Sequence, residues 1–269
     1  MGQAPAPGSA ERLTVLRLSV TPVRSLALQH PESVQLTEHG VVEDRRYLLT
    51  TPDGRLFDAI KHGPLLRIAA EVETDPERLT LRFPGGERVS SEVRLGGTEM
   101  IEVYGRRFTV RPVIGPWAAA VSDYAGRPVR LVRSERLPEE HDRAPTSLVS
   151  AASVARLAEQ LDGDQGLDAR RFRMLIEING AAAHEEDEWV GQLVRVGAAT
   201  IRITKRVARC AITTLDPDTG TRNLATLHAI KAYRGLRERR HIDFGVYGDV
   251  VIPGLVSRGD PVIPARPEG

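Results

Sequence analysis

The sequence contains a single cysteine, Cys210, among 269 residues. One cysteine excludes an intrachain disulfide framework and any metal site built from several thiolates of the chain. It also excludes an iron–sulfur cluster held by the chain's own cysteines, because such clusters need several thiolate ligands. The absence of disulfides fits a reducing compartment, and we expect a cytoplasmic protein.

Other features are missing as well. No apolar run approaches the ~18 residues of a membrane helix, and residues 1–12 read as a disordered tail without the pattern of a secretory signal. The net charge is only +1, which gives no reason to expect a nucleic-acid or membrane partner. Neither a Gly-x-Gly-x-x-G motif after a strand nor a P-loop occurs, so we expect no nucleotide fold of its own.

The pattern of the chain predicts a mainly β protein with peripheral helices, of the α+β class. Short β-rich runs separated by Gly and Pro fill residues 13–113. Helices are predicted over 116–124, 150–161 and 223–234, with Ser150 as the N-cap of the second. Further strands are expected at 174–178, 193–196, 200–203, 250–252 and 262–263.

Cys210 lies in a polar and basic context. Arg206 and Arg209 precede it, and nearby cations favour the thiolate that binds metals or attacks electrophiles. The segment 216–220, Asp-Pro-Asp-Thr-Gly, predicts a tight turn in which Gly220 can take a positive φ. We therefore expect the cysteine to follow a strand and to open a loop. On its own, however, a single cysteine is also typical of a small buried hydrophobic residue.

The run from Arg209 to Gly220, Arg-Cys-x-x-Thr-Thr-x-Asp-Pro-Asp-Thr-Gly, resembles the cysteine motif of the MOSC superfamily. These are the C-terminal domains of molybdenum cofactor sulfurases, and they include the mitochondrial amidoxime-reducing component. Further segments resemble the family in the same order along the chain: 21–25, 40–47, 171–173, 186–191, 196–197, 244–247 and 256–262. In the family, the segments matched by 40–47, 171–173, 244–247 and 256–262 belong to strands.

The resemblance covers residues 13 to 265 and implies two packed domains. A β-rich N-terminal MOSC-associated domain would span 13–113, and a MOSC β-barrel would span 114–266. Since the matched residues come from both domains, we expect them to meet in a cleft between the two.

The resemblance also implies a molybdenum cofactor, whose pterin dithiolene supplies two sulfur ligands. Cys210 matches the cysteine that supplies the third, as metal ligand and catalytic residue. The implied cofactor-binding residues, which in the family include the groups that hold the pterin phosphate, are Arg24, Ser25, Arg45, Arg173, Arg209, Cys210 and Tyr247. One departure concerns the substrate side, because Met174 and Leu175 stand where amidoxime reducers commonly have Pro-Asn.

The implied function is that of a molybdenum-dependent oxidoreductase that reduces small N-hydroxylated substrates. Without a flavin or iron–sulfur motif, the electrons must come from a separate donor protein such as a reductase, ferredoxin or cytochrome. We expect a monomer. Two alternatives stay open: a sulfur carrier that uses a Cys210 persulfide, and a non-catalytic store or carrier of the cofactor.

The histidines and the acidic run are weaker signals. His184 and His228 are expected to be solvated or structural, and Glu185 to Glu188 to form a solvated acidic turn.

Overall fold

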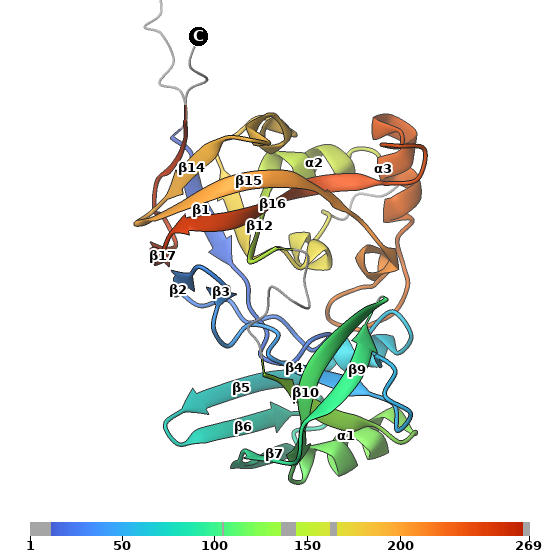
Figure 1. Cartoon of the computed structure of the whole chain (residues 1–269). Coiled ribbons are helices and arrows are strands. Elements are labelled where there is room, and N and C mark those ends of the chain that lie inside the picture. The colour runs from blue at the N-terminus through green and yellow to red at the C-terminus, as the bar shows by residue number, and fades with distance from the viewer. Residues whose placement is uncertain (1–11, 104, 136–143, 162–165, 266–269) are drawn as a thin grey trace, which may run out of the picture.

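The structure is a computed structural model, which describes residues 12–103, 105–135, 144–161 and 166–265. It has two lobes, stacked one above the other in Figure 1. The upper lobe is built on a seven-stranded sheet with the order β1-β13-β12-β16-β15-β14-β18. These strands are β1 Thr14–Leu18, β12 Thr146–Ser150, β13 Ile176–Asn179, β14 Leu193–Val196, β15 Ala199–Ala208, β16 Asp243–Ile252 and β18 Val262–Pro264.

The two edges of this sheet approach each other. Val15 N donates to Asp260 O at 2.9 Å, and Val262 N donates to Leu13 O at 2.9 Å. Because these bonds join β1 to the segment that enters β18, the sheet is nearly closed into a barrel. Its interior holds buried aliphatic residues such as Ile176, Ile178, Val194 and Ile201. Closure removes the exposed edges that would otherwise invite pairing with other chains.

Smaller elements cover this barrel. A three-stranded sheet joins β17 Gly254–Ser257, β2 Ser33–Thr37 and β3 Gly40–Val41. Helix α2 Ala151–Ala158 begins at Ser150, whose side chain accepts from Ser153 N, as the sequence predicts. Helix α3 spans Thr226–Arg234, and single 3₁₀ turns occupy Ala169–Phe172, Glu185–Trp189 and Ala211–Thr214.

The lower lobe combines two antiparallel sheets and one helix. One sheet has the order β4-β11-β10-β8 with β9 paired to β10, and the other the order β5-β6-β7. Their bounds are β4 Tyr47–Thr50, β5 Ala69–Thr74, β6 Glu77–Arg82, β7 Arg88–Glu92, β8 Arg94–Leu95, β9 Glu99–Val103, β10 Arg106–Ile114 and β11 Arg130–Ser134. The helices are α1 Trp117–Ala125 and a 3₁₀ turn over Gly63–Arg67.

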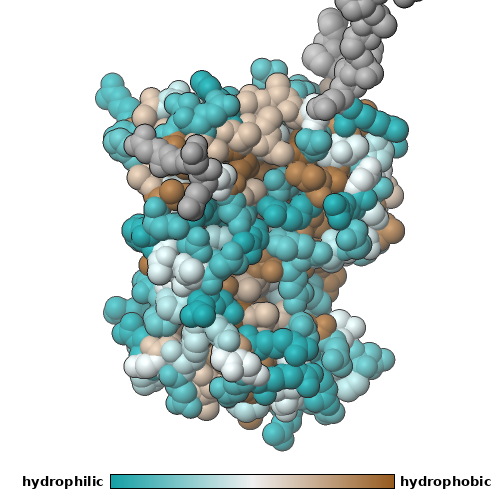
Figure 2. Space-filling view, turned by 180° about the vertical axis from the view of Figure 1, so that it is seen from behind, coloured by the Kyte–Doolittle hydropathy of each residue, from teal (hydrophilic) through white to brown (hydrophobic). Residues whose placement is uncertain are grey.

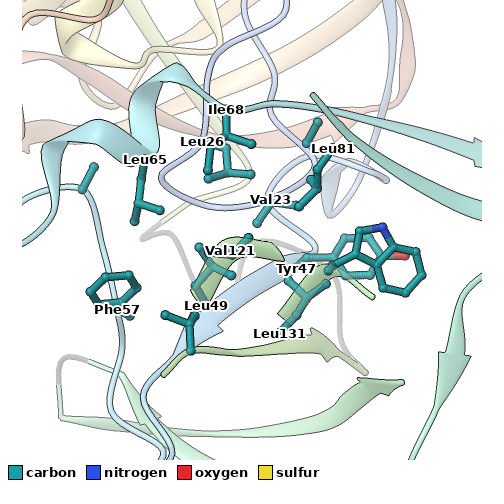
Figure 3. Packing of buried hydrophobic residues seen from close by; sticks show 14 of the residues in the cluster. Val23, Leu26, Tyr47, Leu49, Phe57, Leu65, Ile68, Leu81, Val121 and Leu131 are labelled. Atoms are coloured by element: carbon teal, nitrogen blue, oxygen red, sulfur yellow. The ribbon is translucent and has the colours of Figure 1, made fainter. Parts of the chain in front are cut away.

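The core of the lower lobe explains how distant segments come together in it. Figure 3 shows Val23, Leu26, Tyr47 and Phe57 packed with Val121 and Leu131 from the other end of the lobe's sequence. Trp117 is fully buried, and its indole N–H donates to Leu79 O at 3.0 Å, so its polar atom is satisfied.

The chain therefore crosses between the lobes more than once. Strands β1 to β3 lie in the upper lobe, whereas α1 and β11 lie in the lower lobe, after residue 113. The expected division at residue 113 stays a prediction about sequence domains, and each lobe draws on residues from both sides of it.

The predicted fold class is confirmed: strands dominate and the helices are peripheral. The three predicted helices are present with shifted ends, whereas β2, β7, β11 and β12 were not predicted. The expectation of a strand over 171–173 is wrong, and the expected strand over 40–47 is limited to its first two residues and its last. Arg173 and Arg45 have φ of 52° and 54°, and such left-handed residues interrupt an extended chain. Within the described residues, no helix combines the length and apolar character needed to cross a membrane.

The lobes touch tightly at two glycines. A Cβ added to Gly220 would lie 2.2 Å from Gly63 O, and one added to Gly63 would lie 1.8 Å from Gly220 O. Gly220 also has φ +73°, as its place in the turn predicts. The turn that follows Cys210 is thus seated directly against the lower lobe.

Gly220→Ala should destabilise the protein by about 2–4 kcal/mol, because backbone strain and a steric clash add together. Gly86→Ala is the matched control, since Gly86 has φ +88° but nothing within 4 Å of an added Cβ. Urea unfolding measures both. Equal losses of unfolding free energy in the two variants would mean that the close approach of Gly220 to Gly63 adds no cost to a side chain at position 220.

Candidate functional site

A pocket of about 1010 Å³, counted with its open mouth, lies where the two lobes meet. All seven residues predicted from the sequence line it: Arg24, Ser25, Arg45, Arg173, Arg209, Cys210 and Tyr247. They come from segments far apart in the chain, so the fold brings them together. The roles assigned to them stay predictions.

Cys210 follows the end of β15 and begins the 3₁₀ turn Ala211–Thr214. Its backbone is extended, with φ −125°, and its side chain is exposed at the pocket. Thr213 holds this corner, because its N–H and its hydroxyl both donate to Cys210 O, at 3.3 and 3.2 Å. An exposed thiol at a braced corner is not the buried hydrophobic residue that a lone cysteine commonly is.

Three pocket residues have left-handed backbones. Ser25, Arg45 and Arg173 have φ of 72°, 54° and 52°, and they account for three of the six non-glycine residues with positive φ among those described. Such conformations cost free energy in L-residues and gather at functional sites, where the surrounding structure maintains them.

Hydrogen bonds hold these three loops in place. Arg45 Nη2 donates to Arg173 O at 2.8 Å, and Arg173 Nη2 donates to Leu26 O at 2.7 Å. Asp44 forms an ion pair with Arg45 and accepts from Thr21 N at 2.7 Å. The guanidinium groups therefore serve the fold as well as lining the pocket.

Arg209 stands beside the cysteine. Its Nη2 donates to Phe172 O at 2.9 Å, and its guanidinium carbon lies 5.1 Å from the centre of the Phe172 ring. Burial lowers the pKa of Arg209 to about 10, while Tyr247 and Cys210 oppose that shift, so Arg209 is charged at neutral pH. Its Nε is buried and has no hydrogen-bond partner among the described residues. A half-buried cation with a buried, unused donor suits an anionic ligand.

The remaining walls are mixed. Met174 and Leu175 are 5% and 2% exposed and form an apolar side of the pocket with Phe172. Lys205 lies 5.9 Å from the centre of the Tyr247 ring, which brings a further cation near the site. Four further residues of the pocket were not predicted from the sequence: Asp44, Asp58, Thr146 and Ser147. Asp44 lies beside Arg45 in a matched segment and was therefore detectable, whereas Asp58, Thr146 and Ser147 lie outside every matched segment.

Arg206 is not part of this pocket, although the sequence places it near Cys210. Val207 is buried and lines the pocket, and neighbouring residues of a strand point to opposite faces. Arg206 Nε instead lies 3.4 Å from Asp187 Oδ2. Of the two arginines that precede the cysteine, Arg209 lines the pocket and Arg206 does not.

The acidic run over 185–188 is not the solvated turn that its composition suggested. Glu186 is 0% and Asp187 8% exposed. Glu186 accepts from the Ser153 hydroxyl at 2.7 Å, and Asp187 pairs with Arg234 as well as Arg206. His184 lies in the same buried network, 3.0 Å from the Tyr233 hydroxyl through Nε2 and in contact with Arg234 through Nδ1. The network fixes the outer face of β15, the strand that ends beside Cys210.

Family models match most of the chain. The MOSC domain model matches residues 138–263, and the MOSC N-terminal beta barrel domain model matches residues 12–112. The chain belongs to the MOSC family. It is 27% identical to mitochondrial amidoxime-reducing component 1 of Danio rerio, over 94% of this chain and 86% of that protein. The human component 1 is 26% identical, with 93% and 82% covered.

A second group of MOSC relatives bears another name. The molybdenum cofactor sulfurase of Caenorhabditis briggsae is 24% identical over 87% of this chain, which spans only 33% of that longer protein. Among solved structures, the YuaD protein of Bacillus subtilis aligns over 94% of this chain and 96% of its own, with a TM-score of 0.45 and 10% identity.

The pocket residues of this MOSC protein fit a molybdenum cofactor. The Cys210 thiol, four guanidinium groups and a buried, unused N–H donor are compatible with a metal–pterin phosphate. Among the described residues, no group of three or more His, Cys, Asp or Glu side chains could hold a metal ion by itself.

The buried network predicts an acid sensitivity of folding. Burial lowers the pKa of His184 from 6.5 to about 4. Between pH 6.5 and about 4 the unfolded chain therefore binds a proton that the folded chain does not. Stability should fall by about 1–2 kcal/mol as pH decreases through this window, once solvent screening of the half-buried ring is allowed for. Burial raises the pKa of Glu186, and this shift makes the folded state more stable as pH decreases. The wild type and the His184 variant both contain Glu186, so its effect cancels when the two are compared.

Urea unfolding at pH 7.5, 6 and 4.5 tests this dependence. His184→Gln should be less stable at pH 7.5 but should lose less stability on acidification than the wild type. His228→Gln, at an exposed position of α3, is the control and should keep the wild-type slope. The same pH slope for His184→Gln and the wild type would contradict the assignment.

Proposed function

We propose that this protein binds the molybdenum cofactor in the pocket between its lobes and reduces small N-hydroxylated substrates, with electrons from a separate donor protein. The observation that carries the proposal is the convergence of one exposed cysteine and four arginines on a single pocket. The relatives named amidoxime-reducing components support the reaction class, and they align along nearly the whole chain.

Each pocket residue has a proposed part. Cys210 would ligate the metal through its exposed sulfur, because a thiolate is a soft, anionic donor, whereas the other sulfur of the pocket, in Met174, is a buried thioether. Arg24, Arg45, Arg173 and Arg209 would balance the negative charge of the pterin phosphate, with Ser25 and Tyr247 as hydroxyl donors. The cofactor, when bound, supplies the two-electron chemistry of N–O bond reduction.

The rest of the pocket would orient the substrate. Met174, Leu175 and Phe172 offer an apolar surface on which an aryl or alkyl part of the substrate can rest. Leu175 has no side-chain donor, so the N-hydroxylated group must find its polar partners elsewhere, with Ser147 available in the same pocket. This arrangement favours substrates that combine an apolar body with one N–O group.

The exposed thiol also favours a second function, transfer of sulfur from a Cys210 persulfide, and the relatives named molybdenum cofactor sulfurase agree with it. Such a carrier needs an accessible sulfur but no tightly held pterin. Metal content and reductase activity separate the two functions.

Cys210→Ser should abolish reduction of benzamidoxime while changing the free energy of unfolding by less than about 1 kcal/mol, because the side chain is exposed. Protein from a cofactor-producing host is assayed with dithionite-reduced viologen and, separately, with NADH. The wild type should turn over with viologen and stay inactive with NADH alone. Full activity of Cys210→Ser, or wild-type protein that carries molybdenum without any viologen-driven turnover, would contradict the reductase proposal.

Arg209→Ala should weaken cofactor retention by roughly ten- to a hundredfold, as expected for the loss of one charge-assisted contact. Arg206→Ala is the matched control, since Arg206 also flanks the cysteine but pairs with Asp187. Molybdenum per protein is measured by mass spectrometry after gel filtration. Equal molybdenum contents in the two variants would remove Arg209 from the site.

A further inference from the structure

Positive charge is concentrated in one segment after α3. Residues 231–241 contain five Lys and Arg residues and one Glu, a net charge of +4, whereas the whole chain has a net charge of +1. The remainder of the protein is therefore net negative, and this segment differs from it. In Figure 1 it follows α3 and leads back into β16.

The last part of this segment, residues 236–241, is here called the basic turn. Arg237 and His241 exchange both backbone hydrogen bonds at 2.9 Å, and Arg240 N donates to Arg237 O at 3.2 Å. The two central residues, Glu238 and Arg239, have φ of 51° and 60°. Positive φ at both central positions is typical of type I′ turns, which prefer Asn and Gly.

The basic turn thus has charged residues at positions 238 and 239, where a left-handed backbone is unfavourable for any residue other than glycine. Residues that retain such strain gather at binding sites, where the side chain is needed. Glycine at position 239 would relieve the strain, and the chain has an arginine there instead. Stability of the turn alone would favour glycine at this position, so it does not account for the arginine.

The side chains of the basic turn face solvent. Arg240 is 73% exposed, and Arg239 is exposed with no ion-pair partner among the described residues. Leu236 beside them is 38% exposed. Arg237, in contrast, forms an ion pair with the buried Asp243 and fixes the turn to the start of β16. Exposed arginines next to an exposed leucine are a composition suited to a protein interface.

The anchoring brings the turn to the neighbourhood of Cys210. Asp243 is paired with Ala208 across the sheet, and Arg209 N donates to Ile242 O at 2.7 Å. The basic turn is therefore held by the very backbone that carries Arg209 and Cys210. On the face seen in Figure 2, apolar residues lie in separate groups among hydrophilic ones.

We propose that the basic turn is the docking surface for the electron donor, and that this donor is a small protein with an acidic face. The inference rests on the proposed reductase function, in which electrons come from outside the chain. A donor must approach the pocket closely to deliver electrons. The basic turn is an exposed, charged surface whose adjoining residue, Ile242, accepts a backbone hydrogen bond from Arg209 of the pocket. Opposite charges steer the encounter and fix its orientation.

A nucleic acid fits this surface less well. Its binding draws on many phosphate contacts spread along a strand, whereas the basic turn offers two exposed arginines and a leucine within six residues. Of the two arginines, only Arg239 is without an ion-pair partner among the described residues, because Arg240 lies 3.5 Å from Glu238. A compact acidic patch on a folded protein matches a surface of that size.

The test uses holo-protein and a plant-type [2Fe–2S] ferredoxin as the acidic probe. Arg239→Glu with Arg240→Glu reverses the two exposed charges. Arg88→Glu with Arg94→Glu is the control, because it makes the same change in net charge at exposed positions of the lower lobe. Arg239→Gly removes one charge and relieves the strain. Ferredoxin binding is measured by calorimetry at low and high salt, and turnover is measured with reduced ferredoxin and with reduced viologen.

Reversal at 239 and 240 should weaken ferredoxin binding by about tenfold or more at low salt, and lower ferredoxin-driven turnover in parallel, with viologen-driven turnover unchanged. The control pair should change binding by less than about twofold. Arg239→Gly should raise the melting temperature while weakening binding. Viologen-driven turnover distinguishes the failure of one proposal from the failure of the other. Its absence in the wild type would refute the reductase function, whereas the binding measurements test the docking surface independently of turnover.

Three results would overturn the docking proposal: no ferredoxin binding by the wild type, equal losses in the two charge-reversal pairs, or tighter wild-type binding to a DNA duplex than to ferredoxin in the same buffer.

Discussion

Two arginine side chains that donate to backbone carbonyls maintain the shape of the pocket between the lobes. Arg173 reaches Leu26 in the core of the lower lobe, and Arg45, in the connection between the lobes, reaches Arg173. Both residues have left-handed backbones, and such conformations persist only where the surroundings fix them. The guanidinium groups thus fasten the lobes together and, in doing so, are brought to the mouth of the same pocket as Cys210.

This arrangement has an electrostatic consequence. Four guanidinium groups and two carboxylates, Asp44 and Asp58, line the pocket, so its walls have an excess of positive charge. Like charges repel more strongly where water is partly excluded. Burial lowers the pKa of Arg209, as expected for a cation that lacks its full hydration. An anionic ligand would relieve this repulsion, and the bound state would then be more stable than the empty one.

The sequence was most informative where local chemistry alone decides the structure. Ser150 predicted the start of α2, Gly220 predicted the turn after the cysteine, and the resemblance named seven residues that all line one pocket. It failed where tertiary packing decides. The resemblance implies a strand over 171–173, yet Arg173 has a left-handed backbone and its side chain donates to Leu26 O in the other lobe. Glu186 reads as a surface acid, yet serines of the β12–α2 corner bury it. Leu26 is 147 residues from Arg173 and Ser153 is 33 residues from Glu186, so local sequence patterns do not predict either contact.

The central claim, that the pocket between the lobes holds a molybdenum cofactor through Cys210, is tested most directly by anomalous X-ray diffraction from crystals of the holo-protein. Data collected on both sides of the molybdenum absorption edge locate the metal without any assumption about the ligand. We expect the difference peak beside the Cys210 sulfur, with the phosphate end of the cofactor among Arg24, Arg45, Arg173 and Arg209. A molybdenum peak away from this pocket, in protein that contains the metal, would contradict the claim.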